Sequence, residues 1–280
     1  MTQINYFQDL TVNIQAALQE DIGTGDLTAD LIPPTQQSSA TVITNEPAII
    51  CGRPWFDGVI RAVDANIELD WQVSEGEAVH AGSVICHLKG SAQSILTAER
   101  SALNFLQTLS GTATATNRYV KALKNGYTQL LDTRKTLPGL RLAQKYAVHC
   151  GGGTNHRIGL YDAILIKENH IMAAGGIEQA VSLAKSHHPN KLIEVETESL
   201  AEVEQAVKAK ADIIMLDNFS LEMIEQAVEW VNHRCKLEVS GNVELNDLAE
   251  LTQTGVDYIS TGAITKHLHA IDFSMRFHLE

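Results

Sequence analysis

The sequence has few cysteines and no long apolar run. Its four cysteines lie far apart in the chain and form no Cys-X-X-Cys pair: Cys51, Cys86, Cys150 and Cys235. This spacing indicates neither a disulfide framework nor a zinc site, so we expect reduced thiols in the core or in loops. No segment reaches the roughly 18 apolar residues of a membrane span, and the N-terminus has no basic region followed by an apolar run. We therefore expect a cytoplasmic protein.

Positive charge is also in short supply. The chain carries 21 Lys and Arg against 34 Asp and Glu, a formal net charge of -13 at pH 7. This excess of negative charge repels nucleic acids and anionic membranes, so we expect neither as a partner. An anionic ligand would need a locally basic pocket inside an acidic shell. The glycine fingerprint of dinucleotide-binding domains and the Walker loop are missing as well. We therefore expect no organic cofactor.

The N-terminal part of the sequence is β-rich and leads into a long helix. We expect a helix over residues 12–19, a strand over residues 40–51, and short strands separated by glycine turns over residues 71–88. Over residues 91–123, apolar side chains recur every three or four positions. This period predicts one long helix, with Gly126 as its stop signal.

We expect two domains. A β-rich domain would take residues 1–113, with residues 270–280 as candidates to return to it, and residues 114–269 would form a parallel α/β barrel. The barrel prediction depends on six short apolar runs, each followed by a helix-like segment: YTQLLDT, DAILIKEN, KLIEVET, DIIMLDN, KLEVSGN and DYISTGA. Such a series indicates parallel βα units closed as a barrel.

Each of the six apolar runs ends in polar or charged residues. The carboxyl ends of barrel strands meet at one mouth, which is where α/β barrels place their active sites. Polar residues that merely open loops would explain one or two such ends, but six in a row favour a functional mouth. We therefore expect the active site there.

Two segments supply positive charge to this mouth, Arg134 and Lys135 in the first and His156, Arg157 and Lys167 in the second. Such a cluster favours a carboxylate or phosphate ligand. The alternative for the first segment is a pair of solvated loop cations. A desolvated Lys167 could instead form a Schiff base, as in aldolases. We expect structural roles for His149 and His170.

Two acidic residues, Glu196 and Asp217, end neighbouring strands. Mg²⁺ is held by one or two carboxylates together with substrate phosphates, and carboxylates also accept hydrogen bonds from ribose hydroxyls. Helix capping is the alternative, for which Asp217 is suited and Glu196 is not. The last two strands end in small residues, which are typical of a phosphate site but also routine in such loops: Ser240, Gly241, Asn242, Thr261, Gly262 and Ala263.

These segments together resemble a known family. DTRKTLPGLR, HRIGLYDAILIKENH, EVE, LDNF, EVSGN and STGAIT resemble quinolinate phosphoribosyltransferase in order and spacing, and EDIGTGDLT and AERSALNFLQTLSGTAT resemble its N-terminal half. The resemblance implies transfer of a phosphoribosyl group from phosphoribosyl pyrophosphate to quinolinate, with loss of pyrophosphate and carbon dioxide, in NAD biosynthesis. It also implies Mg²⁺ and a homodimer or larger homo-oligomer. For the fold, it implies an open-faced α/β sandwich as the N-terminal domain and a parallel α/β barrel of about six to seven strands after it. Asp132 departs from the pattern, because relatives often carry a small or apolar residue there, but the cations remain in place.

The resemblance also implies roles for individual residues. Quinolinate would contact Arg100, Thr133, Arg134, His156, Arg157 and Lys167. The catalytic residues would be Lys135, Glu196 and Asp217, with Lys135 and Lys167 on the phosphates and the two acids on the ribose and the metal. The 5-phosphate would lie against the two triplets Ser240–Asn242 and Thr261–Ala263. Arg100 would reach the barrel of the neighbouring subunit.

A carrier or docking domain of lipoyl type is the alternative reading of the segment EGEAVHAGSVI. That segment has no acceptor lysine at the expected hairpin tip, and a carrier domain would leave the barrel unexplained. The sequence therefore favours the enzyme.

Overall fold

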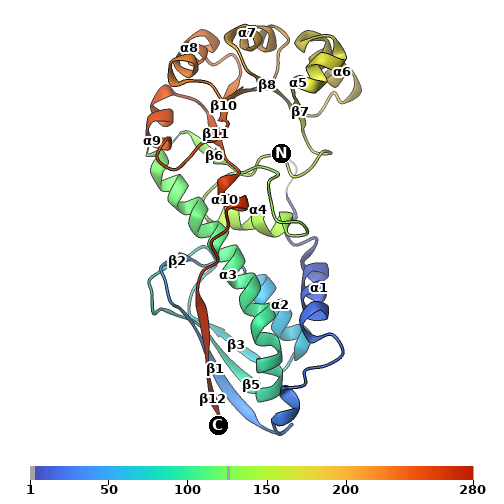
Figure 1. Ribbon diagram of the computed structural model, residues 1–280, viewed down its shortest axis with the longest axis vertical. Helices are drawn as coiled ribbons and strands as arrows, with labels where there is room; N and C mark the ends of the chain where they lie inside the picture. The colour runs from blue at the N-terminus through green and yellow to red at the C-terminus, as the bar shows by residue number, and fades with distance from the viewer. Residues whose placement is uncertain (1–3, 125–126, 280) are drawn as a thin grey trace. The chain divides into compact units, whose positions relative to one another are not determined.

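The structure, a computed structural model, describes residues 4–124 and 127–279 (Figure 1). The chain divides into two compact units. The first comprises Met1–Asn117, Thr136–Gly152 and Thr265–Glu280, and the second comprises Arg118–Lys135 and Gly153–Ile264. None of the helices in the described ranges is long and apolar enough to cross a membrane.

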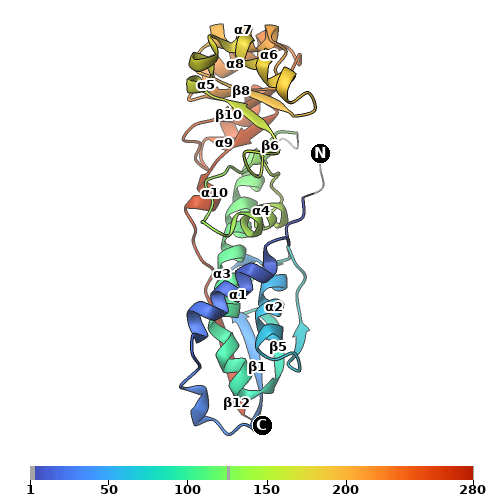
Figure 2. The ribbon, with the colours of Figure 1, turned by 90° about the vertical axis from the view of Figure 1, so that its right-hand side faces the viewer.

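The first unit is built on a four-stranded antiparallel sheet. The strand order is β12-β1-β5-β3, with bounds β1 Gln37–Thr44, β3 Glu68–Trp71, β5 Val84–Ser91 and β12 Phe273–Leu279. Every second residue of β1 is buried, so one face of the sheet points into the core. The helices α1 (Leu10–Ile22), α2 (Arg53–Val63) and α3 (Ala92–Leu123) share that core (Figures 1 and 2). This is the open-faced sandwich expected from the sequence.

Local predictions for the first unit were mostly confirmed. The first helix and the long helix are α1 and α3, and Gly126, the expected stop signal, lies outside the described residues. The strand expected over residues 40–51 is two strands, β1 and β2 (Ala48–Ile49), which pairs with β4 (Ala78–Val79). Pro47 lies in the break, where it cannot donate to a ladder. Helix α2 was not predicted. The 3₁₀ turn η1 spans Ala29–Leu31.

The second unit contains the six predicted strands, all parallel. Their order is β6-β11-β10-β9-β8-β7, with bounds β6 Gln129–Leu131, β7 Ile164–Ile166, β8 Ile193–Thr197, β9 Ile213–Asp217, β10 Lys236–Ser240 and β11 Tyr258–Ser260. In the described part of the chain, β6 and β7 are the two end strands, and a parallel bridge from Leu131 to Thr154 continues the sheet beyond β6.

Helices follow the strands as βα units require. In the second unit, α5 (Glu168–Ala174) and α6 (Ile177–His187) follow β7, α7 (Leu200–Lys208) follows β8 and α8 (Leu221–Val231) follows β9 (Figure 1). Short turns, α9 (Leu248–Leu251), η2 (Thr252–Thr254) and α10 (Ala263–Lys266), follow β10 and β11. The helix after β6, α4 (Arg141–Cys150), belongs to the first unit.

The strand register places the polar residues on one face of the parallel sheet. Paired residues of neighbouring parallel strands share a face, as do alternate residues along one strand. Glu196 and Glu238 both pair with Met215, Ser240 pairs with Asp217, and Leu165, two residues before Lys167, pairs with Glu194. The following residues therefore project from the same face: Lys167, Glu194, Glu196, Asp217, Glu238 and Ser240. Of these, Lys167, Glu196, Asp217 and Ser240 lie at or next to the carboxyl ends of their strands.

Candidate functional site

Asp132 connects the end of β6 to the loop that carries the second cationic segment. Its side chain is fully buried and accepts the backbone N–H of His156 at 2.8 Å and the side-chain amide of Asn155 at 2.9 Å. The residue that departs from the family pattern thus fixes the position of His156. Asp132 is therefore a structural hydrogen-bond acceptor, and Arg134 and Lys135 follow it two and three residues later in the chain.

His156 is held between two protein groups through its ring nitrogens. Nδ1 accepts the backbone N–H of Arg157 at 2.8 Å, and Nε2 lies 2.8 Å from Glu194 Oε2 and 3.6 Å from Glu238 Oε2. A ring nitrogen that accepts an N–H carries no proton, so Nε2 carries the proton and donates it to Glu194. The Arg157 N–H and Glu194 together fix the orientation of the imidazole ring.

Glu194 in β8 and Glu238 in β10 are buried acidic residues that were not predicted from the sequence as part of the site. Both side chains are buried, at 2% and 0% relative exposure. Burial, together with the neighbouring charge of Glu194, raises the pKa of Glu238 to about 8. Glu238 is consequently mostly protonated at neutral pH and adds little negative charge to this buried position. An acidic residue inside an otherwise apolar strand, two positions before Glu196, was the signal available in the sequence.

Replacing Glu238 tests this assignment through the pH dependence of stability. Folded protein keeps the Glu238 proton up to about pH 8, whereas the unfolded chain releases it near its usual value of 4.5. Between these values the unfolded chain binds fewer protons, so the free energy of unfolding falls as pH rises. We expect Glu238→Gln to gain stability over wild type across this window, by on the order of a few kcal/mol, with the full gain above pH 8.

Urea unfolding at pH values below, inside and above the window measures this gain. Glu229→Gln, at an exposed position on α8, is the matched control for the Glu-to-Gln change itself. A difference between Glu238→Gln and wild type that stays constant with pH would contradict a proton held on Glu238.

Arg157 is a half-buried cation close to Arg134. Burial and then the charge of Arg134 lower the pKa of Arg157, while Glu194, Asp162 and Glu196 act in the opposite direction. The loop that follows Arg157 is fixed by Asp162, whose carboxylate accepts the N–H groups of Ile158 and Gly159 at 2.7 and 2.9 Å. Two close guanidinium groups repel each other, so this part of the site favours a ligand that carries more than one negative charge.

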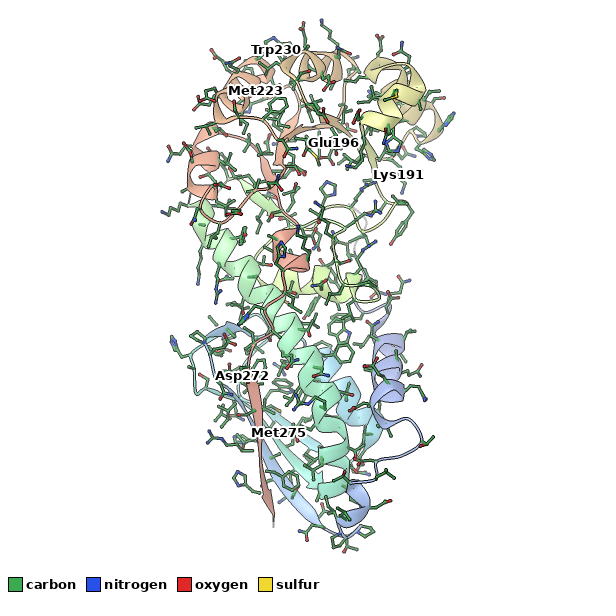
Figure 3. The ribbon with its side chains drawn as sticks, viewed as in Figure 1. Lys191, Glu196, Met223, Trp230, Asp272 and Met275 are labelled. Atoms are coloured by element: carbon green, nitrogen blue, oxygen red, sulfur yellow. The ribbon has the colours of Figure 1, made fainter. Side chains whose placement is uncertain are left out.

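Lys167 pairs with Glu196 at the ends of β7 and β8. The distance from Nζ to Oε2 is 2.5 Å, and the lysine side chain is 48% exposed (Figure 3 labels Glu196). A Schiff-base lysine needs desolvation, whereas Lys167 is about half exposed and ion-paired, so this alternative loses its basis. His170 Nδ1 accepts the Lys167 N–H at 3.0 Å at the start of α5, which is a structural contact, as expected. His149, in the first unit, stacks on Tyr6 with ring centroids 5.9 Å apart.

Asp217 and the triplet after β10 meet through Asn218. The Asn218 side-chain amide donates to Asp217 at 2.9 Å, and its backbone N–H donates to the Ser240 carbonyl at 3.0 Å. Gly241 has φ +98°, and a Cβ there would lie 2.3 Å from Asn218 Oδ1. Asn242 follows with φ +47°. Only glycine allows this approach, which brings the ends of β9 and β10 together.

Gly241→Ala should therefore destabilise the second unit more than an alanine at a comparable glycine. Gly255 has a similar φ of +88°, but its nearest atom would be Val228 Cγ1 at 3.7 Å. Both variants incur the cost of left-handed backbone, about 1–2 kcal/mol, and Gly241→Ala adds overpacking of about 1–3 kcal/mol. Urea unfolding of both variants measures the difference. Equal losses would mean that Asn218 moves away without cost.

The end of β11 packs against the first cationic segment. A Cβ on Gly262 would lie 2.8 Å from Lys135 Cδ and 3.2 Å from Thr133 Oγ1. Thr133 Oγ1 in turn accepts the N–H of Lys135 at 3.0 Å, and the N–H groups of Thr261 and Ala263 donate to the Leu131 carbonyl and to Thr261 Oγ1. Lys135 therefore lies beside the small-residue triplet after β11.

The structure brings together all but one of the predicted site residues in the second unit, at the carboxyl ends of its strands. The exception is Arg100, which is exposed on α3 in the first unit, where its charge acts on Glu99.

Comparison with known proteins identifies the family. The chain matches the family models of the N-terminal domain of quinolinate phosphoribosyl transferase over residues 26–110 and of its C-terminal domain over residues 112–276. The chain belongs to the quinolinate phosphoribosyltransferase family. The solved nicotinate-nucleotide pyrophosphorylase of Francisella tularensis is 52% identical, with a TM-score of 0.95 over 99% of this chain and 98% of that one.

Two curated relatives support the same assignment. Each carries the name probable nicotinate-nucleotide pyrophosphorylase [carboxylating]. The protein from Synechocystis is 40% identical, covering 94% of this chain and 90% of its own length, and the one from Bacillus subtilis is 40% identical over 91% and 89%. This member of the quinolinate phosphoribosyltransferase family thus matches relatives along nearly their whole length.

Proposed function

We propose that the protein transfers the phosphoribosyl group of phosphoribosyl pyrophosphate to quinolinate with decarboxylation, giving nicotinate mononucleotide, pyrophosphate and CO₂ in NAD biosynthesis. The observation that carries the proposal is the cationic group at the carboxyl ends of the strands, where Lys167 pairs with Glu196 and where the charges of Arg134 and Glu196 both act on Arg157. Two guanidinium groups that repel each other beside a lysine favour a ligand with two carboxylates. The names of the relatives agree with it, since they include quinolinate phosphoribosyltransferase [decarboxylating] in Nicotiana tabacum.

The chemistry needs alignment and charge stabilisation rather than a covalent nucleophile. Displacement at the ribose carbon passes through a cationic, oxocarbenium-like state, and the departing pyrophosphate must be neutralised. We propose that Lys135 and Lys167 bind the phosphates and that Glu196 and Asp217 bind the ribose. The triplets Ser240–Asn242 and Thr261–Ala263 would hold the 5-phosphate through backbone N–H groups. Once ribosylated, the ring nitrogen is positively charged, and this charge stabilises the electron pair left on the neighbouring ring carbon when carbon dioxide departs. A proton from solvent then takes the place of the lost carboxylate on that carbon.

We propose that His156 acts by positioning Arg157. Its ring nitrogens contact the Arg157 backbone and Glu194, so the ring fixes the start of the arginine side chain from a buried anchor. Thr133, Arg134, Arg157 and Lys167 would then contact quinolinate directly. The resemblance implies that His156 contacts quinolinate. In this proposal His156 instead acts on quinolinate only through Arg157.

Glu196 and Asp217 fit a Mg²⁺ ion that arrives with the substrate. Both are partly exposed carboxylates on one face of the neighbouring strands β8 and β9. Glu196 forms an ion pair with Lys167, and Asp217 accepts a hydrogen bond from the Asn218 side chain. Two carboxylates with substrate phosphates are the ligands that Mg²⁺ takes in phosphate sites. When bound, the ion would neutralise charge on the pyrophosphate.

Replacing both acids tests this metal assignment. We expect Glu196→Ala with Asp217→Ala to raise the Mg²⁺ concentration needed for half-maximal rate by about tenfold or more. Rates over a Mg²⁺ titration measure the shift. Full activity of the double variant in excess chelator would contradict the metal role.

The function is tested by offering the pure protein two acids. We expect carbon dioxide release from quinolinate with phosphoribosyl pyrophosphate and Mg²⁺. We expect little or no transfer to nicotinate, because a single carboxylate compensates the repulsion between the half-buried Arg134 and Arg157 less well than two carboxylates do. Chromatography of the nucleotide product and capture of labelled carbon dioxide measure both reactions. Comparable turnover of nicotinate would overturn the assignment. We further propose a cytoplasmic homodimer or larger homo-oligomer.

A further inference from the structure

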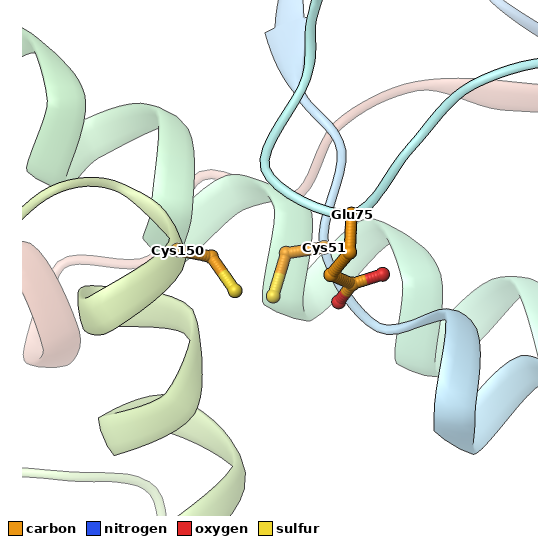
Figure 4. A group of neighbouring side chains, drawn as sticks. All are labelled: Cys51, Glu75 and Cys150. Carbon is orange, nitrogen blue, oxygen red and sulfur yellow. The ribbon is translucent and has the colours of Figure 1, made fainter.

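Two cysteines of the first unit face each other outside the candidate site. Cys51 lies between β2 and α2, and Cys150 is the last residue of α4. Their sulfur atoms and a carboxylate oxygen of Glu75 all lie within 4.8 Å of one another. Figure 4 shows the two sulfur atoms pointing toward each other, with Glu75 beside Cys51.

Both cysteines are fixed against the same helix. Cys51 donates its N–H to Ser110 Oγ, and Ser110 Oγ–H donates to the Cys51 carbonyl, each at 3.0 Å. At the end of α4, a Cβ on Gly151 would lie 2.5 Å from the Ala113 carbonyl oxygen, so the residue after Cys150 packs tightly on α3 as well. The backbone on both sides of the cysteine pair is therefore held by packing and hydrogen bonds to one helix.

The two thiols differ in exposure and acidity. Cys51 is fully buried, and burial raises its pKa well above the usual value, whereas Cys150 is half-buried and a hydrogen bond from the Cys51 thiol lowers its pKa. An accessible thiol of lower pKa beside a buried second thiol is the arrangement that favours oxidation to a disulfide.

A metal ion explains these contacts less well than a dithiol. The two oxygens of Glu75 already accept the N–H groups of Gly52 and Arg53, at 2.7 and 3.2 Å, at the start of α2. A cation held by this set would also require a thiolate on the fully buried Cys51. A disulfide leaves Glu75 in its capping role and adds no buried charge.

We propose that Cys51 and Cys150 are an oxidisable dithiol that hydrogen peroxide converts into a disulfide between the β2–α2 turn and the end of α4. The Cys150 thiolate attacks one peroxide oxygen, the O–O bond breaks, and hydroxide leaves, which gives a sulfenic acid. The Cys51 sulfur loses its proton and attacks the Cys150 sulfur, and the S–O bond breaks. In total, two thiols and one peroxide give one disulfide and two waters.

The test treats the reduced full-length protein with an equivalent of hydrogen peroxide. We expect a mass loss of about 2 Da, loss of two of the four free thiols, and a cross-linked peptide pair that contains Cys51 and Cys150, all reversed by dithiothreitol. The cross-link closes a long loop, so the oxidised protein should unfold at a temperature about 3–10 °C higher than the reduced protein.

Variants separate the possible outcomes. Cys150→Ser should lose the cross-link, Cys51→Ala should stop at a Cys150 sulfenic acid that dimedone traps, and Cys235→Ser, in the second unit, should keep the cross-link. The peptide map of the wild type decides even if Cys51→Ala fails to fold. A bridge to another cysteine, or Cys150 sulfinic acid with an intact Cys51 thiol, would overturn the proposal. The proposal would also be overturned if the purified protein carried one equivalent of zinc that had to be removed before the cysteines could be oxidised. That result would favour a cation site.

Discussion

Arg157→Ala is expected to lower kcat/KM for quinolinate by about 30- to 5000-fold, because truncating one partner of a desolvated charge pair costs about 2–5 kcal/mol. Its stability should not fall with its activity. Burial and the nearby Arg134 already disfavour the Arg157 cation in the free protein. Glu194, Asp162 and Glu196 offset this effect only in part, so removing the cation relieves a net unfavourable interaction, as is usual for residues placed for function.

Two further variants make this expectation specific. Arg157→Lys keeps the charge but loses the two-pronged guanidinium, so it should retain more activity than alanine and less than wild type. Arg234→Ala is the matched control and should leave kcat/KM unchanged. Arg234 lies over the Trp230 ring at 4.2 Å and precedes β10, so it is on the amino side of the strands and not at their carboxyl ends. Steady-state kinetics and thermal unfolding of all three are compared. An Arg157→Ala variant that loses activity only in proportion to its unfolded fraction would show a structural role.

The strand ends were predictable because they follow from local pattern and a general property of the fold. Each apolar run marked a strand, and parallel strands place their carboxyl ends at one edge, which located Lys167, Glu196 and Asp217 without knowledge of long-range contacts. The family resemblance then supplied roles for these residues that the pattern alone left open between binding and capping.

The two buried acidic residues were not predicted because a single sequence does not show which face of a strand is buried. Glu194 and Glu238 occupy alternating positions that would face water in a half-exposed strand. Here they lie inside, where His156 and a retained proton compensate the burial. The placement of α4 in the first unit was equally hidden. It depends on long-range contacts such as the buried bond from Gln144 Nε2 to Thr112 Oγ1, at 3.2 Å, which no periodicity encodes.

Mixing two inactive variants should restore activity if Arg100 completes the site of a neighbouring subunit. Arg100 is exposed on α3 in the first unit, and Lys135 lies beside the β11 triplet in the second. Arg100→Ala and Lys135→Ala should each be nearly inactive alone, since each removes a charge-assisted contact worth about 1.5–3 kcal/mol in a site shielded from water.

The recovery follows from the symmetry of a shared site. In a mixed dimer, one site receives both lesions and the other receives neither, so random mixing of equal amounts should return about a quarter of the wild-type activity. Lys135→Ala mixed with Lys167→Ala is the control, because both changes lie in the same unit and every site in a mixed dimer keeps one lesion. Native mass spectrometry verifies the hybrids. Verified heterodimers without recovery would show that Arg100 serves its own chain, and a monomeric protein would remove the shared site altogether.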